Sequence, residues 1–180
     1  MFKDFNISSF KKMKPPGDNT FDTSQEIKAL VKIPLKKEFV KKFDNIESAF
    51  AKTAKDNNVE NYDKTIPAKL IKESAPIILE LKKHFNRPRP KVLAKKMNIK
   101  MKDYEMSSMK TPSYPSGHSV QGILIAKVLG DKHPKAKSAF AKTGENISYS
   151  RRVAHAHYKS DSKMGEKLGN SMYKHIKNKI

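Results

Sequence analysis

One segment toward the carboxyl end of the chain places a positive charge on the apolar face of a predicted helix. Between residues 136 and 154, small and apolar side chains recur at the spacing typical of an amphipathic helix. The residues on this face are Ala136, Phe140, Thr143, Ile147, Arg151 and Ala154. Because an unpaired buried charge is strongly unfavourable, Arg151 needs either a permanent carboxylate partner or a pocket that receives an anionic ligand.

A histidine and an acid follow that helix. His157 and Asp161 are spaced so that a carboxylate can hold one imidazole nitrogen while the other nitrogen points at a substrate. Together with Arg151, an oriented histidine and the acid that orients it indicate phosphate chemistry.

Apolar residues elsewhere in the chain also recur at helical spacing, and no segment alternates as a strand would. A capping box at Thr23-Ser24-Gln25-Glu26 is expected to open a helix that Pro34 kinks or ends. Further helices are expected over about 36–55, 77–85 after Pro76, 91–97, 117–129 and 136–156, with a last helix that Asp161 is placed to cap. Gly165 and Gly169 would let this last helix pack closely on a neighbour.

The sequence therefore predicts an all-α fold, a single-domain helical bundle of 180 residues. We expect an irregular arm over residues 1–20 and a helical domain over residues 21–180. A domain of this size buries roughly 70% of the surface of its unfolded chain, so a sizeable core can form.

Charge and cysteine content limit the partners. The chain has no cysteine, which excludes disulfides and thiolate metal sites, and its net charge is +20. Such a charge attracts polyanions, so nucleic acid, nucleotides and anionic membrane surfaces are eligible partners. The lysines are nevertheless spread along the chain, as is typical of solvated helix faces.

The sequence lacks signals for secretion or membrane insertion. The charged start at Met1 is not followed by the apolar run of a signal peptide. No stretch approaches the ~20 apolar residues of a membrane span, and Lys127 interrupts the longest apolar segment. We therefore expect a soluble, cytoplasmic protein without a membrane span, while the sequence leaves an oligomeric state open.

Two further segments carry groups suited to an anion. Arg87-Pro88-Arg89-Pro90 restricts the backbone around Arg89 and presets the direction of its side chain, although a solvated basic turn is the simpler alternative. Pro115-Ser116-Gly117-His118 opens the most apolar helix. Free backbone N–H groups, a hydroxyl, a glycine and a histidine there make an anion cradle with a proton donor, and ordinary capping by Ser116 is the alternative.

Taken in order, these segments resemble the three-part signature of the phosphatidic acid phosphatase type 2 superfamily. The matching motifs are Lys82 with Arg89-Pro90, Pro115-Ser116-Gly117-His118, and Ser150-Arg151 with His157 and Asp161. That superfamily includes lipid phosphatases, bacterial class A acid phosphatases and vanadium-dependent haloperoxidases. The resemblance covers a core of residues 82–169 and implies a helical bundle.

The resemblance implies a role for each motif residue. His157 would be the nucleophile that forms a phosphohistidine, Asp161 would orient it, and His118 would protonate the leaving oxygen and then activate water. The phosphoryl oxygens would be held by Lys82, Arg89, Ser116, Gly117 and Arg151. No metal or other cofactor is implied, and vanadate is expected to bind as a phosphate mimic.

We therefore expect an acid phosphatase-like monoesterase that acts on soluble anionic esters such as nucleotides or sugar phosphates. The alternatives are a vanadium-dependent haloperoxidase and a basic nucleic-acid-binding or structural protein with a vestigial site. The chain lacks the interleaved aromatic and basic residues of a stacking platform, which argues against nucleic-acid binding. His155 stands where many relatives carry glycine and is interpreted as a surface bystander. Arg87 and Arg152 are interpreted as surface charges, and residues 91–114 as a candidate lid.

Overall fold

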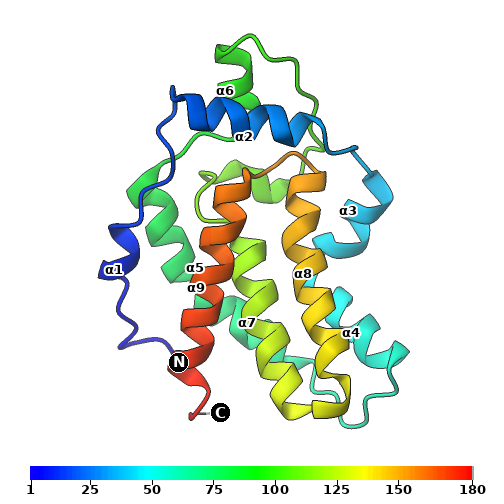
Figure 1. Cartoon of the computed structure of the whole chain (residues 1–180). Coiled ribbons are helices and arrows are strands. Elements are labelled where there is room, and N and C mark those ends of the chain that lie inside the picture. Colours follow the sequence, from blue (N-terminus) through cyan, green and yellow to red (C-terminus); the bar gives the residue numbers. More distant parts are fainter. Residues whose placement is uncertain (180) are drawn as a thin grey trace.

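The computed structural model describes residues 1–179, and the regular elements of these residues are all helices (Figure 1). The elements in chain order are α1 (Ser8–Lys11), α2 (Phe21–Val31), α3 (Lys37–Asp44), α4 (Ile46–Asp56), α5 (Thr65–Phe85), α6 (Pro90–Lys96), the 3-10 turn η1 (Ser107–Lys110), α7 (Gly117–Lys132), the 3-10 turn η2 (Pro134–Ala136), α8 (Lys137–Val153) and α9 (Lys159–Ile176). The predicted all-α helical bundle is thus confirmed.

The centre of the bundle is α7, which packs against α8 and α9 (Figure 1). Its apolar residues are buried, apart from the half-buried Ile123, in agreement with the prediction that this helix is central. Glycines permit the close approach of its neighbours: a Cβ atom at Gly165 would lie 2.6 Å from the carbonyl oxygen of Ser116, and one at Gly169 would lie 2.5 Å from that of Val120. The expected role of these two glycines in close packing is therefore confirmed.

The predicted apolar face of α8 is buried against this core. Phe140 and Ile147 are fully buried, and Arg151 is 1% exposed, so its guanidinium does lie inside the protein. At the end where α8 stops and α9 begins, α2 and α6 lie across the bundle (Figure 1).

Two helix starts differ from prediction. Thr23 does not cap α2, because it is fully buried and its hydroxyl donates to the carbonyl of Gly17 at 2.7 Å. Thr20 is the capping residue instead. The expected helix over 36–55 is divided into α3 and α4 at Asn45, whose extended backbone and side chain cap α4 by accepting from Ser48 N–H at 2.9 Å.

The helix expected to start after Pro76 is longer than predicted, because α5 continues through that proline. A proline inside a helix removes one N–H donor and disturbs the preceding turn. In that turn the carbonyl of Ile71 accepts hydrogen bonds from the Ser74 hydroxyl at 3.1 Å and from Gln121 of α7 at 3.4 Å.

Residues 1–20 are mostly irregular, as expected, but they include the short helix α1 and contribute to the core. Phe2 and Phe10 are buried in the main hydrophobic cluster, and the rings of Phe2 and Phe5 both lie near His175 of α9. Within residues 1–179, no helix has the length and apolar character needed to cross a membrane.

Candidate active site

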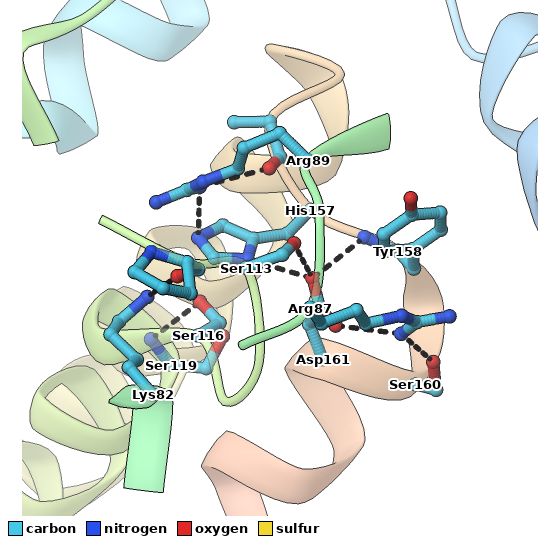
Figure 2. A network of polar contacts seen from close by, with 12 residues as sticks. Lys82, Arg87, Arg89, Ser113, Ser116, Ser119, His157, Tyr158, Ser160 and Asp161 are labelled. Carbon is cyan, nitrogen blue, oxygen red and sulfur yellow. Dashed lines mark hydrogen bonds and ion pairs between the residues drawn. The ribbon is translucent and has the colours of Figure 1, made fainter. Parts of the chain in front are cut away.

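The ends of α5, α7, α8 and α9 bring the predicted site residues together, and Figure 2 shows Lys82, Arg89, Ser116, His157 and Asp161 among them. Lys82 lies in the last turn of α5, Ser116 directly precedes α7, and Arg151 lies in the last turn of α8. His157 is in the link between α8 and α9, and Asp161 is in the first turn of α9. Residues far apart in sequence therefore meet at one end of the bundle.

His157 lies between a carboxylate and a guanidinium. Its Nδ1 lies 2.9 Å from Oδ2 of Asp161, and its Nε2 lies 2.9 Å from Nη1 of Arg89. A guanidinium can only donate and a carboxylate can only accept, so Nδ1 carries the proton and Nε2 presents its lone pair. Burial, reinforced by the charge of Arg89, lowers the pKa of His157 to about 3. The imidazole is therefore neutral, with an unprotonated Nε2.

Asp161 is fully buried and lies inside α9 rather than at its cap. Tyr158 occupies the capping position, and its N–H donates to Oδ2 of Asp161 at 3.1 Å. The hydroxyl of Ser113 also donates to Oδ2, while Nη1 of Arg87 donates to Oδ1 at 2.8 Å. Burial alone raises the pKa of Asp161, but the bond from His157 and the nearby positive charge hold it below its ordinary value.

Lys82 and Arg89 are buried cations whose partners are mostly backbone carbonyls. Lys82 donates to the carbonyl of Pro112, and Arg89 donates to the carbonyls of Thr111 at 2.9 Å and Ser108 at 3.0 Å. Burial lowers the pKa of Lys82 to about 7. Carbonyl oxygens carry only partial negative charge, so an anionic ligand would be a stronger partner for both side chains.

Arg151 has a carboxylate partner and also a free donor. Its Nη1 donates to Oδ1 of Asp44 at 2.9 Å and contacts Sδ of Met106 at 3.2 Å. Its Nη2 is buried and has no hydrogen-bond partner within residues 1–179. The sequence required either a carboxylate partner for Arg151 or a pocket for an anionic ligand. The carboxylate partner is observed, and the second nitrogen remains available for a ligand.

His118 faces the end of α3. Its Nε2 lies 2.8 Å from the carbonyl oxygen of Asp44, so this nitrogen carries a proton that it donates. Burial and the charge of Arg151 lower the pKa of His118 to about 4. Asp44, which therefore contacts two site residues, was not predicted; the only signal was a polar Asp44-Asn45 pair that interrupts an apolar helical pattern.

The start of α7 provides backbone donors. Ser116 caps the helix by accepting from Ser119 N–H at 3.3 Å, and its own N–H donates to the carbonyl of Asp161 at 3.1 Å. The Ser119 hydroxyl oxygen lies 2.9 Å from that of Ser116 and 2.8 Å from that of Ser148, so the three hydroxyls form a hydrogen-bonded chain. The N–H groups of Gly117 and His118 have no acceptor inside the helix, because a helix leaves its first donors unpaired. Capping by Ser116 is therefore observed, and it leaves the N–H groups of Gly117 and His118 available for an anion.

Two residues interpreted as surface groups are buried. Arg87 is 1% exposed, with its guanidinium carbon 3.7 Å from the ring centre of Tyr158. His155 has a left-handed backbone with φ of 55°, and its ring nitrogens lie 2.6 Å from the carbonyl oxygen of Lys102 and 2.7 Å from that of Ile33. Both interpretations were wrong, because both side chains are buried. Their partners are distant in sequence, so the local pattern did not show them.

The segment expected as a lid lies beside the site. Its residues bind Arg89 as described above, and Tyr104 N–H donates to the carbonyl of Ala154 at 3.0 Å. A cavity of about 460 Å³ opens next to Arg89, with Val92, Met106 and Met109 among its lining residues. This cavity offers space for the body of a ligand whose anionic group reaches the buried cations.

The site is thus an arrangement of buried cations around an oriented histidine in a helical bundle, which is chemically suited to an anion. The family model of the PAP2 superfamily matches residues 70–174, and the chain belongs to this superfamily. The resemblance drawn from the three motifs is thereby confirmed.

Individual relatives agree with this assignment. The chain is 36% identical over 88 residues to a non-specific acid phosphatase of Salmonella typhimurium (strain LT2), a match that covers 49% of this chain and 35% of the relative. A non-specific acid phosphatase of Salmonella typhi is 35% identical over the same length and with the same coverage. The chain thus spans about a third of the length of these curated relatives.

A solved structure shares the fold. The transmembrane PAP2 type phosphatidylglycerolphosphate phosphatase of Bacillus subtilis matches with a TM-score of 0.59 and 19% identity, over 99% of this chain and 96% of that one. At this identity the likeness concerns the fold alone.

Proposed function

We propose that this chain is a phosphomonoesterase that transfers the phosphoryl group of soluble anionic esters first to His157 and then to water. The observation that carries the proposal is the unprotonated Nε2 of His157, which lies beside the buried guanidinium of Arg89 while Asp161 holds Nδ1. The two Salmonella relatives are non-specific acid phosphatases, which supports the same reaction.

In the first step, Nε2 of His157 attacks phosphorus as the bond to the ester oxygen breaks. Arg89 turns its Nη1 from Nε2 to a phosphoryl oxygen, which frees the lone pair for attack. His118 reacts in its protonated form: it passes one ring proton to the leaving oxygen and becomes neutral, while it keeps the Nε2 proton that it donates to the Asp44 carbonyl. Asp161 stabilises the imidazolium formed at His157.

The phosphoryl oxygens would be held by groups that lie at the same end of the bundle as His157. Lys82, Arg89 and the free Nη2 of Arg151 supply positive charge, and the N–H groups at the start of α7 supply further donors. Phosphoryl transfer needs charge stabilisation at these oxygens more than additional covalent chemistry. In this mechanism the basic side chains provide that stabilisation without a metal ion, and vanadate occupies the same place as phosphate.

In the second step, water attacks the phosphohistidine. His118, now neutral, accepts a proton from that water, and His157 leaves with its bonding pair returned to Nε2. Inorganic phosphate then departs, and the starting protonation states are restored.

The decisive experiment compares hydrolysis of p-nitrophenyl phosphate by the intact chain and by His157→Ala. We expect vanadate to inhibit the intact chain and the substitution to lower kcat by about 10⁴-fold or more, as removal of a nucleophile does. His84→Ala, which removes an exposed histidine, should retain activity. Retained turnover in His157→Ala would refute the mechanism; bromide oxidation by peroxide with vanadate, without phosphatase turnover, would favour a haloperoxidase.

The substrate class follows from charge. A net charge of +20 attracts multiply charged esters such as nucleotides or sugar phosphates, and added salt weakens that attraction. We expect kcat/KM for a nucleotide to exceed that for p-nitrophenyl phosphate at low salt and to fall more steeply as salt is added. Equal values at low salt would contradict this substrate class.

A further inference from the structure

Arg87 forms a buried ion pair with Asp161, the acid that orients His157 (Figure 2). Nη1 of Arg87 donates to Oδ1 of Asp161 at 2.8 Å and to the hydroxyl of Ser160 at 2.7 Å. Nη2 of the same guanidinium donates to Oε2 of Glu26 at 3.2 Å. Charges of alternating sign therefore run from Glu26 through Arg87 to Asp161, which ends on the ring of His157.

Glu26 is fixed at the other end of this line. Its Oε1 accepts from the N–H of Ser160 at 2.7 Å, and its Oε2 accepts from the hydroxyl of Ser160 at 2.7 Å. Through these bonds α2, which precedes the region matched by the family model, reaches the first turn of α9.

Arg87 also contacts Ser113 and Tyr158, the residues that donate other hydrogen bonds to Asp161. Its carbonyl accepts from the N–H of Ser113 at 2.8 Å, and the hydroxyl of Ser113 binds Oδ2 of Asp161. The ring of Tyr158 covers the face of the guanidinium, and the N–H of Tyr158 binds the same carboxylate oxygen. Movement of Arg87 would therefore disturb several partners of Asp161 together.

We propose that Arg87 and Glu26 are positioning residues, which hold the Asp161 carboxylate in place and set how much negative charge it presents to His157. The proposal rests on the function proposed for His157. Neither residue touches the reacting atoms, and both act through Asp161.

The two residues should have opposite effects. Arg87 draws negative charge toward Oδ1 and so weakens the hydrogen bond between Oδ2 and Nδ1 of His157. Glu26 offsets part of the charge of Arg87. Loss of Arg87 should strengthen the bond and make His157 easier to protonate, whereas loss of the Glu26 charge should weaken it. Lys82 and Arg89, the other charged groups facing the ring, are unchanged in these variants.

The test is the proton resonance of Nδ1–H of His157 in nitrogen-labelled protein, which moves downfield as its hydrogen bond strengthens. We expect a downfield shift in Arg87→Gln and an upfield shift in Glu26→Gln. The matched controls are Arg152→Gln, which removes an arginine that stacks on Tyr149, and Glu38→Gln, which removes an exposed carboxylate. Both controls should leave the resonance in place.

A conservative variant separates charge from orientation. Arg87→Lys keeps the positive charge but cannot hold three partners with a planar fork. Its acid limb of kcat/KM should stay in place while kcat falls. Arg87→Gln should move that limb to higher pH and lower kcat by about 100-fold, the loss that a displacement of about 1 Å can cause. A purely structural role would lower activity equally at every pH.

An unchanged resonance in Arg87→Gln, or shifts of the same sign in both charge variants, would overturn the proposal. If Arg87→Gln does not fold, the expected upfield shift in Glu26→Gln still decides, because Glu26 is at the partly exposed end of the line. The resonance requires no turnover. Absence of phosphatase activity in the intact chain would thus refute the proposed function while leaving this test valid.

Discussion

His118 is a site residue whose acid chemistry depends on its surroundings. Burial and the charge of Arg151 lower its pKa to about 4, so in the empty site the protonated acid becomes scarce above that pH. A bound phosphoryl group adds negative charge and raises this pKa again. The kcat/KM, which reports the free protein, should therefore rise as pH falls from about 7 toward 4, while kcat should persist to higher pH.

This dependence can be measured with two esters. An alkyl phosphate needs a proton on its leaving oxygen more than p-nitrophenyl phosphate does, so His118→Ala should lose more activity on the alkyl ester. Profiles from about pH 3 to 9 would show both effects. A kcat/KM that stays flat to pH 9, or equal losses on the two esters, would contradict the assignment of His118 as the acid.

Single residues also mark the limit of what the sequence could predict. Spacing and motif order identified His157 and Asp161, because a histidine and a carboxylate four positions apart can meet on local geometry alone. Arg87 and Glu26 are 61 positions apart, and His155 binds a carbonyl 122 positions away. No local pattern announces such partners, so buried arginine and histidine were interpreted as surface groups.

At the scale of helices, apolar spacing predicted where most helices lie but not where they end. Apolar residues recur on both sides of the polar Asp44-Asn45 pair, yet the helix is divided there, and the Asn45 side chain replaces the ladder acceptor for Ser48 N–H at the start of α4. Conversely, Pro76 was expected to start a helix and instead lies inside α5. The proline removes one hydrogen bond from a helix that starts at Thr65 and packs against α7, and this packing is not visible in the local sequence.

The contact between α9 and α7 sets the position of Asp161, which makes Gly165 sensitive to substitution. A Cβ at Gly165 would lie 2.6 Å from the Ser116 carbonyl oxygen and 2.7 Å from Cβ of Ser119, both parts of rigid elements. Gly165→Ala should therefore lower the free energy of unfolding by about 1–3 kcal/mol, the usual cost of overpacking. It should also lower phosphatase activity by moving α9.

Urea unfolding would measure this loss, with Gly130→Ala as the control. A Cβ at Gly130 meets first the side chain of Lys137, which can move, and alanine is the better helix former. We expect the control to unfold at an unchanged or higher urea concentration. Equal midpoints for the two variants would mean that α9 does not depend on close packing at Gly165.

For the molecule as a whole, the boundary drawn at residue 20 separates segments that pack together. The aromatic residues of the first segment join the main core near the end of α9, and α2 binds the start of α9 through Glu26. Irregular backbone does not exclude burial, because a few aromatic side chains can attach a loop to a core. The lack of helical spacing in residues 1–20 predicted the irregular backbone correctly but gave no sign that these aromatic side chains are buried.

This attachment predicts a large contribution to stability from Phe10, which is 5% exposed and stacks on Phe5 with ring centres 5.8 Å apart. Phe10→Ala should lower the free energy of unfolding by about 3–5 kcal/mol, the usual cost of removing a buried phenylalanine. Phe21→Ala removes the same atoms from a side chain that is 74% exposed and should change it by less than about 0.5 kcal/mol. Urea unfolding followed by circular dichroism would compare the two. Similar midpoints would mean that residues 1–20 detach from the bundle in solution, whereas the expected difference would make them part of one cooperative unit with the site.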